Sequence, residues 1–133
     1  MLLNEPSSYR LIRGALEEAE AYSRQALITV PEDAGVNNNL AMVYLTQQEK
    51  LDEAERMANL ALAQGGPLQP YVLDTMAQIY VRQRRYREAQ TVLNNAEALA
   101  PPYDRTLHQR LTQLQQELAT SHPRTEEGLE VEH

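Results

Sequence analysis

Apolar side chains recur along the chain at the spacing of amphipathic helices. Near the end, four leucines are separated by four, three and four residues, at Leu107, Leu111, Leu114 and Leu118. That spacing places all four on one face of a helix. The pattern predicts an all-α fold. The expected helices span residues 8–13, 15–29, 34–48, 51–64, 70–83, 86–99 and 103–120.

Residues that begin helices stand at several of these boundaries. Asp33 and Asp104 precede expected helices, and a short acidic side chain can accept a hydrogen bond from the first free backbone amides. Pro70 suits the first turn of a helix, because the amide that proline lacks has no partner there. These positions support the predicted boundaries independently of the apolar pattern.

A set of small residues repeats along the sequence. One alanine recurs every 35 residues, at Ala19, Ala54 and Ala89. A second alanine follows each of them after seven residues, at Ala26, Ala61 and Ala96. A residue that ends helices follows five positions later, at Pro31, Gly66 and Pro101. Two alanines seven residues apart lie on one helical face, where they let a neighbouring helix approach closely.

A second motif shows that each repeating unit holds two helices. Leu40-Ala41-x-x-Tyr44 matches Met76-Ala77-x-x-Tyr80, and the two copies lie 36 residues apart. Each copy precedes one of the alanine pairs. The first helix of a unit therefore carries a large-small-x-x-Tyr pattern, and the second carries the paired alanines.

This arrangement resembles the tetratricopeptide repeat, a helix–turn–helix unit of about 34 residues. Residues 70–101 match the family pattern best, and Asn37 stands where the family usually has tryptophan. The resemblance implies an α-solenoid of antiparallel helix pairs, with two and a half to three repeats and a C-terminal capping helix. The third unit, with its Leu73-Asp74-Thr75 start, resembles the closing repeats of bacterial arrays, including arrays linked to polysaccharide export and secretion.

The expected domain is residues 1–120, followed by a disordered acidic tail at 121–133. Its units are about 7–33, 34–68 and 69–102, with the capping helix at 103–120. Only Ser7–Arg13 is available for the first helix of the first unit. Either Met1–Arg13 folds over the helix at 15–29, or the chain is the end of a longer array, and we favour the second.

The resemblance also implies a concave groove lined by the first helix of each unit, where a peptide or helix of a partner protein would bind. The residues expected to face it are Asn38, Asn39, Met42 and Leu45 in one unit, Tyr71, Asp74, Thr75, Gln78 and Arg82 in the next, and Arg105, His108 and Thr112 on the capping helix. Asn38 and Asn39 offer amide donors and acceptors to a peptide backbone. The alternative is that asparagine is simply tolerated near a helix start. Some family members clamp a terminal carboxylate, but Tyr71 and Thr75 stand where the cations should be.

Charge is spread unevenly. The net charge is −7, with −6 in residues 1–55, +3 in residues 56–110 and −4 in the remainder. An acidic total argues against general nucleic-acid binding. Four arginines cluster at Arg82, Arg84, Arg85 and Arg87. Arginine is a soluble residue that suits helices and turns, and we favour this explanation of the cluster. The alternative is that the arginines bind an acidic partner, which the Glu17–Glu18 turn of a second copy of the chain could supply.

Motifs of enzymes are missing from the sequence. There is no cysteine, so disulfides and cysteine-based metal sites are excluded. His108 has no second histidine nearby, and phosphate-binding loops and nucleophile motifs are absent. We therefore expect no catalysis, metal or cofactor. No apolar run is long enough for a membrane helix. The sequence favours a scaffold for protein–protein interaction, and self-assembly is the alternative role. We expect a cytoplasmic location, or a periplasmic one if the chain is a fragment of an exported protein.

Overall fold

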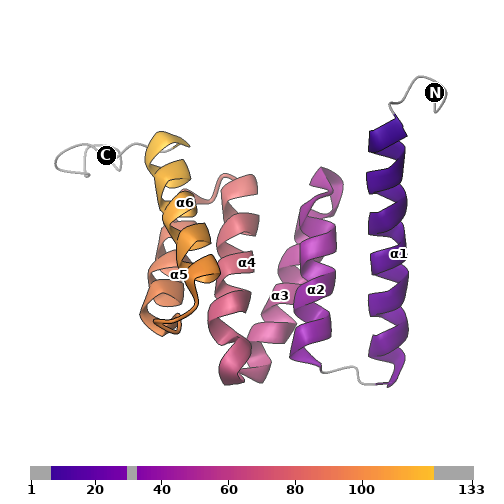
Figure 1. Cartoon of the computed structure of the whole chain (residues 1–133), viewed down its shortest axis with the longest axis horizontal. Coiled ribbons are helices and arrows are strands. Elements are labelled where there is room, and N and C mark those ends of the chain that lie inside the picture. Colours follow the sequence, from indigo (N-terminus) through magenta and orange to yellow (C-terminus); the bar gives the residue numbers. More distant parts are fainter. Residues whose placement is uncertain (1–6, 30–32, 122–133) are drawn as a thin grey trace. The chain divides into compact units, whose positions relative to one another are not determined.

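The computed structural model describes residues 7–29 and 33–121, and every regular element in this part of the chain is helical. Figure 1 colours the helices by their place in the sequence, from indigo at the N-terminus to yellow at the C-terminus. The chain divides into two compact units, Met1–Gly65 and Gly66–His133. The prediction of an all-α fold is confirmed for the residues described.

The first unit holds helices α1 (Ser7–Thr29), α2 (Ala34–Leu45) and α3 (Leu51–Gln64). Helix α2 packs against both α1 and α3 (Figure 1). Asp33 caps α2, since its carboxylate accepts a hydrogen bond of 2.9 Å from the backbone amide of Val36. The core of this unit is formed by Leu40, Ala41, Val43, Tyr44, Leu45, Leu51, Ala54, Met57, Ala58 and Ala61.

A polar cluster joins α1 to α2. The Tyr44 hydroxyl donates a hydrogen bond of 2.9 Å to Glu20, which also accepts one of 3.1 Å from Arg24 Nε. Lys50 Nζ lies 3.6 Å from the same carboxylate. Partial desolvation raises the pKa of Glu20, but the bonds from Tyr44 and Arg24 together with the charge of Lys50 outweigh it, so the net pKa is lowered.

The second unit holds α4 (Gln69–Arg82), α5 (Tyr86–Leu99) and α6 (Arg105–Ser121). Helix α6 packs against both α4 and α5. Pro70 lies in the first turn of α4, and Asp104 caps α6 through a 3.0 Å hydrogen bond from the Leu107 amide. The four leucines of α6 are buried, as their spacing predicts.

The repeated alanines lie where helices pack. Ala54 and Ala61 of α3 and Ala89 and Ala96 of α5 are at most 1% exposed. A buried alanine leaves room for the neighbouring helix to come close. In α1, by contrast, Ala19 and Ala26 are only half-buried.

Helix α4 ends in a turn with arginine at the left-handed position. Arg84 has a φ of 62°. The Arg84 amide donates to the Val81 carbonyl at 3.0 Å, and the Arg85 amide donates to the Tyr80 carbonyl at 2.8 Å. This is the Schellman pattern of helix ends, in which glycine is the usual residue at the left-handed position.

The N-terminal helices correct one prediction. Residues 8–13 and 15–29 were expected as two helices, but α1 runs without a break from Ser7 to Thr29. Gly14 lowers helix propensity by about 1 kcal/mol relative to alanine, which one long helix tolerates. Ser7–Arg13 therefore extends α1 and does not fold back over it.

Other boundaries differ by small amounts. Helix α2 ends at Leu45 and a 3₁₀ turn follows at Gln48–Lys50, where the expected helix ran to residue 48. Ser121 belongs to α6 instead of the expected tail. The remainder of the expected tail, residues 122–133, and the helix-ending Pro31 lie outside the described residues.

Candidate functional site

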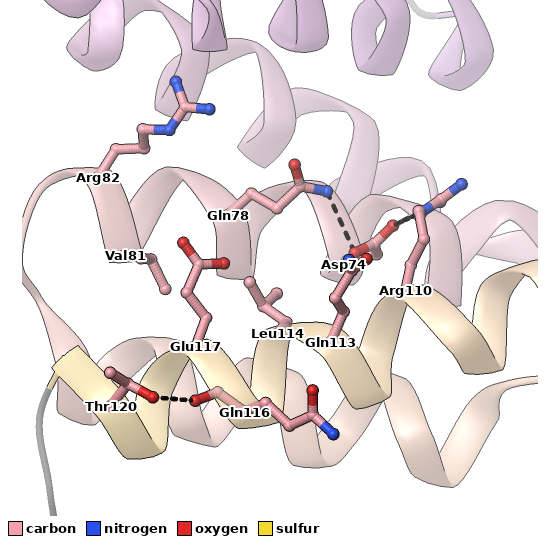
Figure 2. A pocket seen from close by; sticks show the side chains of 10 residues that line it. All are labelled: Asp74, Gln78, Val81, Arg82, Arg110, Gln113, Leu114, Gln116, Glu117 and Thr120. Carbon is pink, nitrogen blue, oxygen red and sulfur yellow. Dashed lines mark hydrogen bonds and ion pairs between the residues drawn. The ribbon is translucent and has the colours of Figure 1, made fainter.

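A pocket of about 540 Å³ lies between α4 and α6 in the second unit (Figure 2). It is lined by Asp74, Gln78, Val81, Arg82, Arg110, Gln113, Leu114, Gln116, Glu117 and Thr120. Helices α4 and α6 pack against each other. The lining residues come from the mostly polar side of each helix that borders this contact.

An ion pair between buried Asp74 and exposed Arg110 forms one end of the pocket. Asp74 is 1% exposed, and its Oδ2 accepts hydrogen bonds from Arg110 Nε at 2.9 Å and Nη2 at 2.5 Å. Its Oδ1 accepts from the Gln78 amide at 3.2 Å. The two bonds to one carboxylate fix the plane of the guanidinium. Arg110 keeps 45% of its side chain exposed, so the pair presents a held guanidinium to solvent.

The remaining polar groups are mostly uncharged hydrogen-bonding side chains. Gln113 and Gln116 add two amides to that of Gln78. In Figure 2 the side chains of Gln78 and Glu117 extend from opposite helices into the same space. The Thr120 hydroxyl donates to the Gln116 carbonyl at 3.0 Å. Primary amides both donate and accept, so this part of the pocket can match either kind of group on a ligand.

The charges of the pocket balance. Two carboxylates, of Asp74 and Glu117, stand against two guanidiniums, of Arg82 and Arg110. Val81 and Leu114 add apolar surface. A neutral pocket with paired charges, several amides and some apolar surface fits a ligand that is itself neutral and rich in donors and acceptors.

The structure brings three of the predicted groove residues of α4 together in this pocket: Asp74, Gln78 and Arg82. Tyr71 and Thr75 do not line it. Thr75 is 2% exposed, and its hydroxyl donates to the Tyr71 carbonyl at 3.2 Å. Because Thr75 is buried, its hydroxyl is not accessible to a binding partner.

The side chain of Tyr71 is engaged with the start of α6. Its hydroxyl donates to Asp104 Oδ2 at 2.5 Å. This bond raises the pKa of Tyr71. The same bond, with that from the Leu107 amide, lowers the pKa of Asp104. Tyr71 therefore joins α4 to the N-terminal cap of α6.

Arg105 and His108 lie along a different hollow, on the outer side of α6. Its lining residues are Pro102, Arg105, His108, Gln109, Thr112, Gln113 and Gln116. His108 Nε2 lies 2.9 Å from the Pro101 carbonyl, so this nitrogen carries the proton and holds the ring against the α5–α6 connection. Gln113 and Gln116 line both this hollow and the α4/α6 pocket.

The predicted groove residues of the first unit lie on α2. Asn39 and Met42 are exposed, and Asn38 is half-buried, with an Oδ1 that accepts no hydrogen bond from the residues described. Leu45 is buried in the core. Asn37 is also buried, as expected for a residue in the packing position, and its amide donates to the Asp33 carbonyl at 3.1 Å.

Several pocket residues on α6 were not singled out from the sequence. The polar residues Arg110, Gln113, Glu117 and Thr120 form a row with intervals of three, four and three, beside the leucine stripe. The same helical spacing that identified the leucines could have identified this row. The residues of α6 that were expected to face the groove were Arg105, His108 and Thr112, which lie on another face of the helix.

The described residues hold neither a metal-binding cluster nor a membrane-spanning helix. No three acidic or histidine side chains among them gather as a metal site would require. None of the helices in residues 7–29 and 33–121 is both long and apolar enough to cross a bilayer.

Comparisons with family models, with curated proteins and with solved structures gave no match. The interpretation of the pocket therefore depends on its geometry.

Proposed function

We propose that this chain is a tetratricopeptide-type interaction module that binds a peptide segment of a partner protein in the α4/α6 pocket. The fold contains two packed helix pairs, α2 with α3 and α4 with α5, each with buried alanines on its second helix. Close helix packing at small residues is what the repeat pattern of the sequence requires.

The observation that carries the proposal is the set of hydrogen-bonding groups in the pocket. An extended peptide presents a carbonyl acceptor and an amide donor at each residue. Gln78, Gln113 and Gln116 supply amides that can pair with both. Arg110, held by Asp74, supplies donors in a fixed orientation, which reduces the side-chain ordering needed on binding.

Selection from a random peptide library tests this function. The full chain is immobilised, peptides are selected on it, and the strongest is measured by calorimetry. We expect the variant Gln78→Ala/Gln113→Ala to bind that peptide about tenfold more weakly, since each lost hydrogen bond contributes about 0.5–1.5 kcal/mol. The control is Asn59→Ala/Asn94→Ala, which removes two amides from exposed positions on α3 and α5. Equal affinities for the wild type and both variants would exclude the pocket as the binding site.

Self-association is the second candidate, and the exposed apolar side chains of α1 favour it. Ile12, Tyr22 and Ile28 are 60%, 80% and 76% exposed. Large apolar side chains in water are often covered in an assembly. Sedimentation velocity of the wild type and of Tyr22→Gln/Ile28→Gln over a range of concentrations tests it. A monomer at all concentrations would remove this candidate.

A further inference from the structure

The hollow on the outer side of α6 differs in charge from the α4/α6 pocket. Its volume is about 430 Å³, and the described residues that line it include Arg105 and no carboxylate. In the α4/α6 pocket, by contrast, two carboxylates balance two guanidiniums. Uncompensated positive charge at a concave surface attracts an anionic group. The outer hollow and the pocket therefore favour different parts of a ligand.

The side chain of Arg105 is available to an anionic group. It is exposed, and no acidic side chain in residues 7–29 and 33–121 pairs with it. The adjacent acid, Asp104, accepts hydrogen bonds from the Tyr71 hydroxyl and the Leu107 amide instead. The Arg105 guanidinium therefore keeps its donors, whose planar arrangement matches the two oxygens of a carboxylate.

Uncharged donors lie beside this arginine on the same face of α6. Gln109 and Thr112 follow Arg105 by four and seven positions, and both side chains are exposed in the hollow. His108 is held in place, since its Nε2 lies 2.9 Å from the Pro101 carbonyl. A carboxylate on Arg105 can accept a further hydrogen bond from the Gln109 amide, because each carboxylate oxygen has two acceptor positions. One cation with neutral donors beside it suits a single carboxylate.

The hollow is continuous with the α4/α6 pocket. Gln113 and Gln116 line both of them. In Figure 2 the Gln116 side chain lies on the side of α6 away from Gln78. Arg105 precedes Gln113 by eight positions, which is about 12 Å along the helix axis. About four extended peptide residues span that distance. A peptide bound in the pocket can therefore continue over α6 and reach Arg105.

We propose that the outer hollow binds an aspartate or glutamate side chain of the same peptide, about four residues from the segment in the α4/α6 pocket. The inference rests on the proposed function in that the partner is a peptide, and it adds the chemistry and the position of one recognised residue. Nucleic acid fits less well, because Arg105 is the only arginine among the described residues of the hollow and the whole chain has a net charge of −7.

A peptide library with blocked ends tests the inference. Peptides of about ten residues, long enough to span both sites, are acetylated and amidated, so that every carboxylate belongs to a side chain. They are selected on the immobilised full chain, on Arg105→Gln and on Arg56→Gln. The last is the matched control, because Arg56 is an exposed arginine of α3 outside the hollow. We expect aspartate and glutamate to be enriched at one position with the wild type and Arg56→Gln, and not with Arg105→Gln.

The strongest peptide then gives a quantitative check by calorimetry. It is compared with a counterpart in which the enriched acid is replaced by its amide. We expect Arg105→Gln to weaken binding of the acidic peptide about two- to fivefold, the range for an exposed ion pair, and to leave binding of the amide peptide unchanged. Raising the salt from about 0.05 M to about 0.5 M is expected to reduce the difference between the two peptides, because salt screens exposed charges. An equal loss for both peptides would overturn the inference.

The outcomes separate this inference from the proposed function. Selected peptides without an acidic preference would leave the pocket as a peptide site and remove the hollow, as would an acidic preference equally strong in Arg105→Gln. Gln78→Ala changes the pocket alone, since Gln78 does not line the hollow. Binding that depends on Arg105 and is unchanged in Gln78→Ala would support the hollow and contradict the pocket. A selection that yields no peptide would remove both.

Discussion

At the scale of single residues, Arg84 combines a strained backbone with an exposed charge. We expect Arg84→Gly to raise the free energy of unfolding by about 0.5–1 kcal/mol, because the strain of about 1–2 kcal/mol is relieved and part of the gain is offset by the flexibility of glycine in the unfolded chain. Urea denaturation followed by circular dichroism measures the change.

Arg84→Ala is the control for this prediction. It removes the same charge and keeps the Cβ, so its backbone strain stays. A gain in stability as large in Arg84→Ala as in Arg84→Gly would assign the effect to charge repulsion among the arginines instead of to the backbone conformation.

The ion pair of Asp74 and Arg110 predicts unequal effects for its two members. Arg110→Ala leaves a buried carboxylate with only the Gln78 amide, and we expect it to lower the free energy of unfolding by about 2–3 kcal/mol. Asp74→Asn leaves Arg110, which is 45% exposed, free to turn toward water, and a loss of about 1 kcal/mol is expected. Urea denaturation of both variants gives the comparison, and a larger loss in Asp74→Asn would contradict the assignment.

The two aspartates that cap helices were predictable from sequence, whereas the environment of Asp74 was not. Asp33 and Asp104 precede apolar periodic segments, and a cap is a local interaction. Asp74 was expected to face a groove, but its partner Arg110 lies 36 residues away on α6. Local periodicity places a residue on a helical face and does not identify the long-range partner that buries it.

At the scale of helices, the buried alanines set how closely neighbours approach. We expect Ala89→Leu to lower the free energy of unfolding by about 1–3 kcal/mol, because Ala89 is 0% exposed and additional atoms force α4 and α5 apart. Ala98→Leu on the exposed side of the same helix is the control, with an expected change within about 0.5 kcal/mol. Thermal unfolding checks both, and two equal losses would show that helix propensity is the cause.

Helix positions from α2 to α6 were predicted to within a few residues, because apolar periodicity, the starts at Asp33, Pro70 and Asp104 and the terminators at Gly66 and Pro101 mark them in the sequence. The first helix was predicted less well. Its expected break at Gly14 is absent, because one glycine is too weak to end a helix when no proline or cap accompanies it. Three of the four α4 residues that line the α4/α6 pocket, Asp74, Gln78 and Arg82, were named from the sequence as groove residues, and the α6 row was overlooked.

At the scale of the whole molecule, the lowered pKa values predict how stability depends on pH. Glu20, Glu88 and Asp104 all have pKa values below their usual ones in the folded chain. In the unfolded chain these groups bind protons at higher pH than in the folded chain. Their contribution to stability is therefore complete above the usual value of 4.5 for glutamate and is lost as the pH falls through the lowered values.

Glu20→Gln isolates one of these groups. Its carboxylate accepts a bond from Tyr44 of α2 and one from Arg24 of its own helix, and it pairs with Lys50 of the 3₁₀ turn that follows α2. We expect Glu20→Gln to be less stable than the wild type at pH 7, with the difference shrinking as the pH approaches 3, where the wild-type carboxyl is also becoming neutral. Urea denaturation at pH 7, 5, 4 and 3 measures it. A difference that stays constant down to pH 3 would mean that Glu20 acts through packing, and that the charged contacts between α1 and α2 do not hold the first unit together.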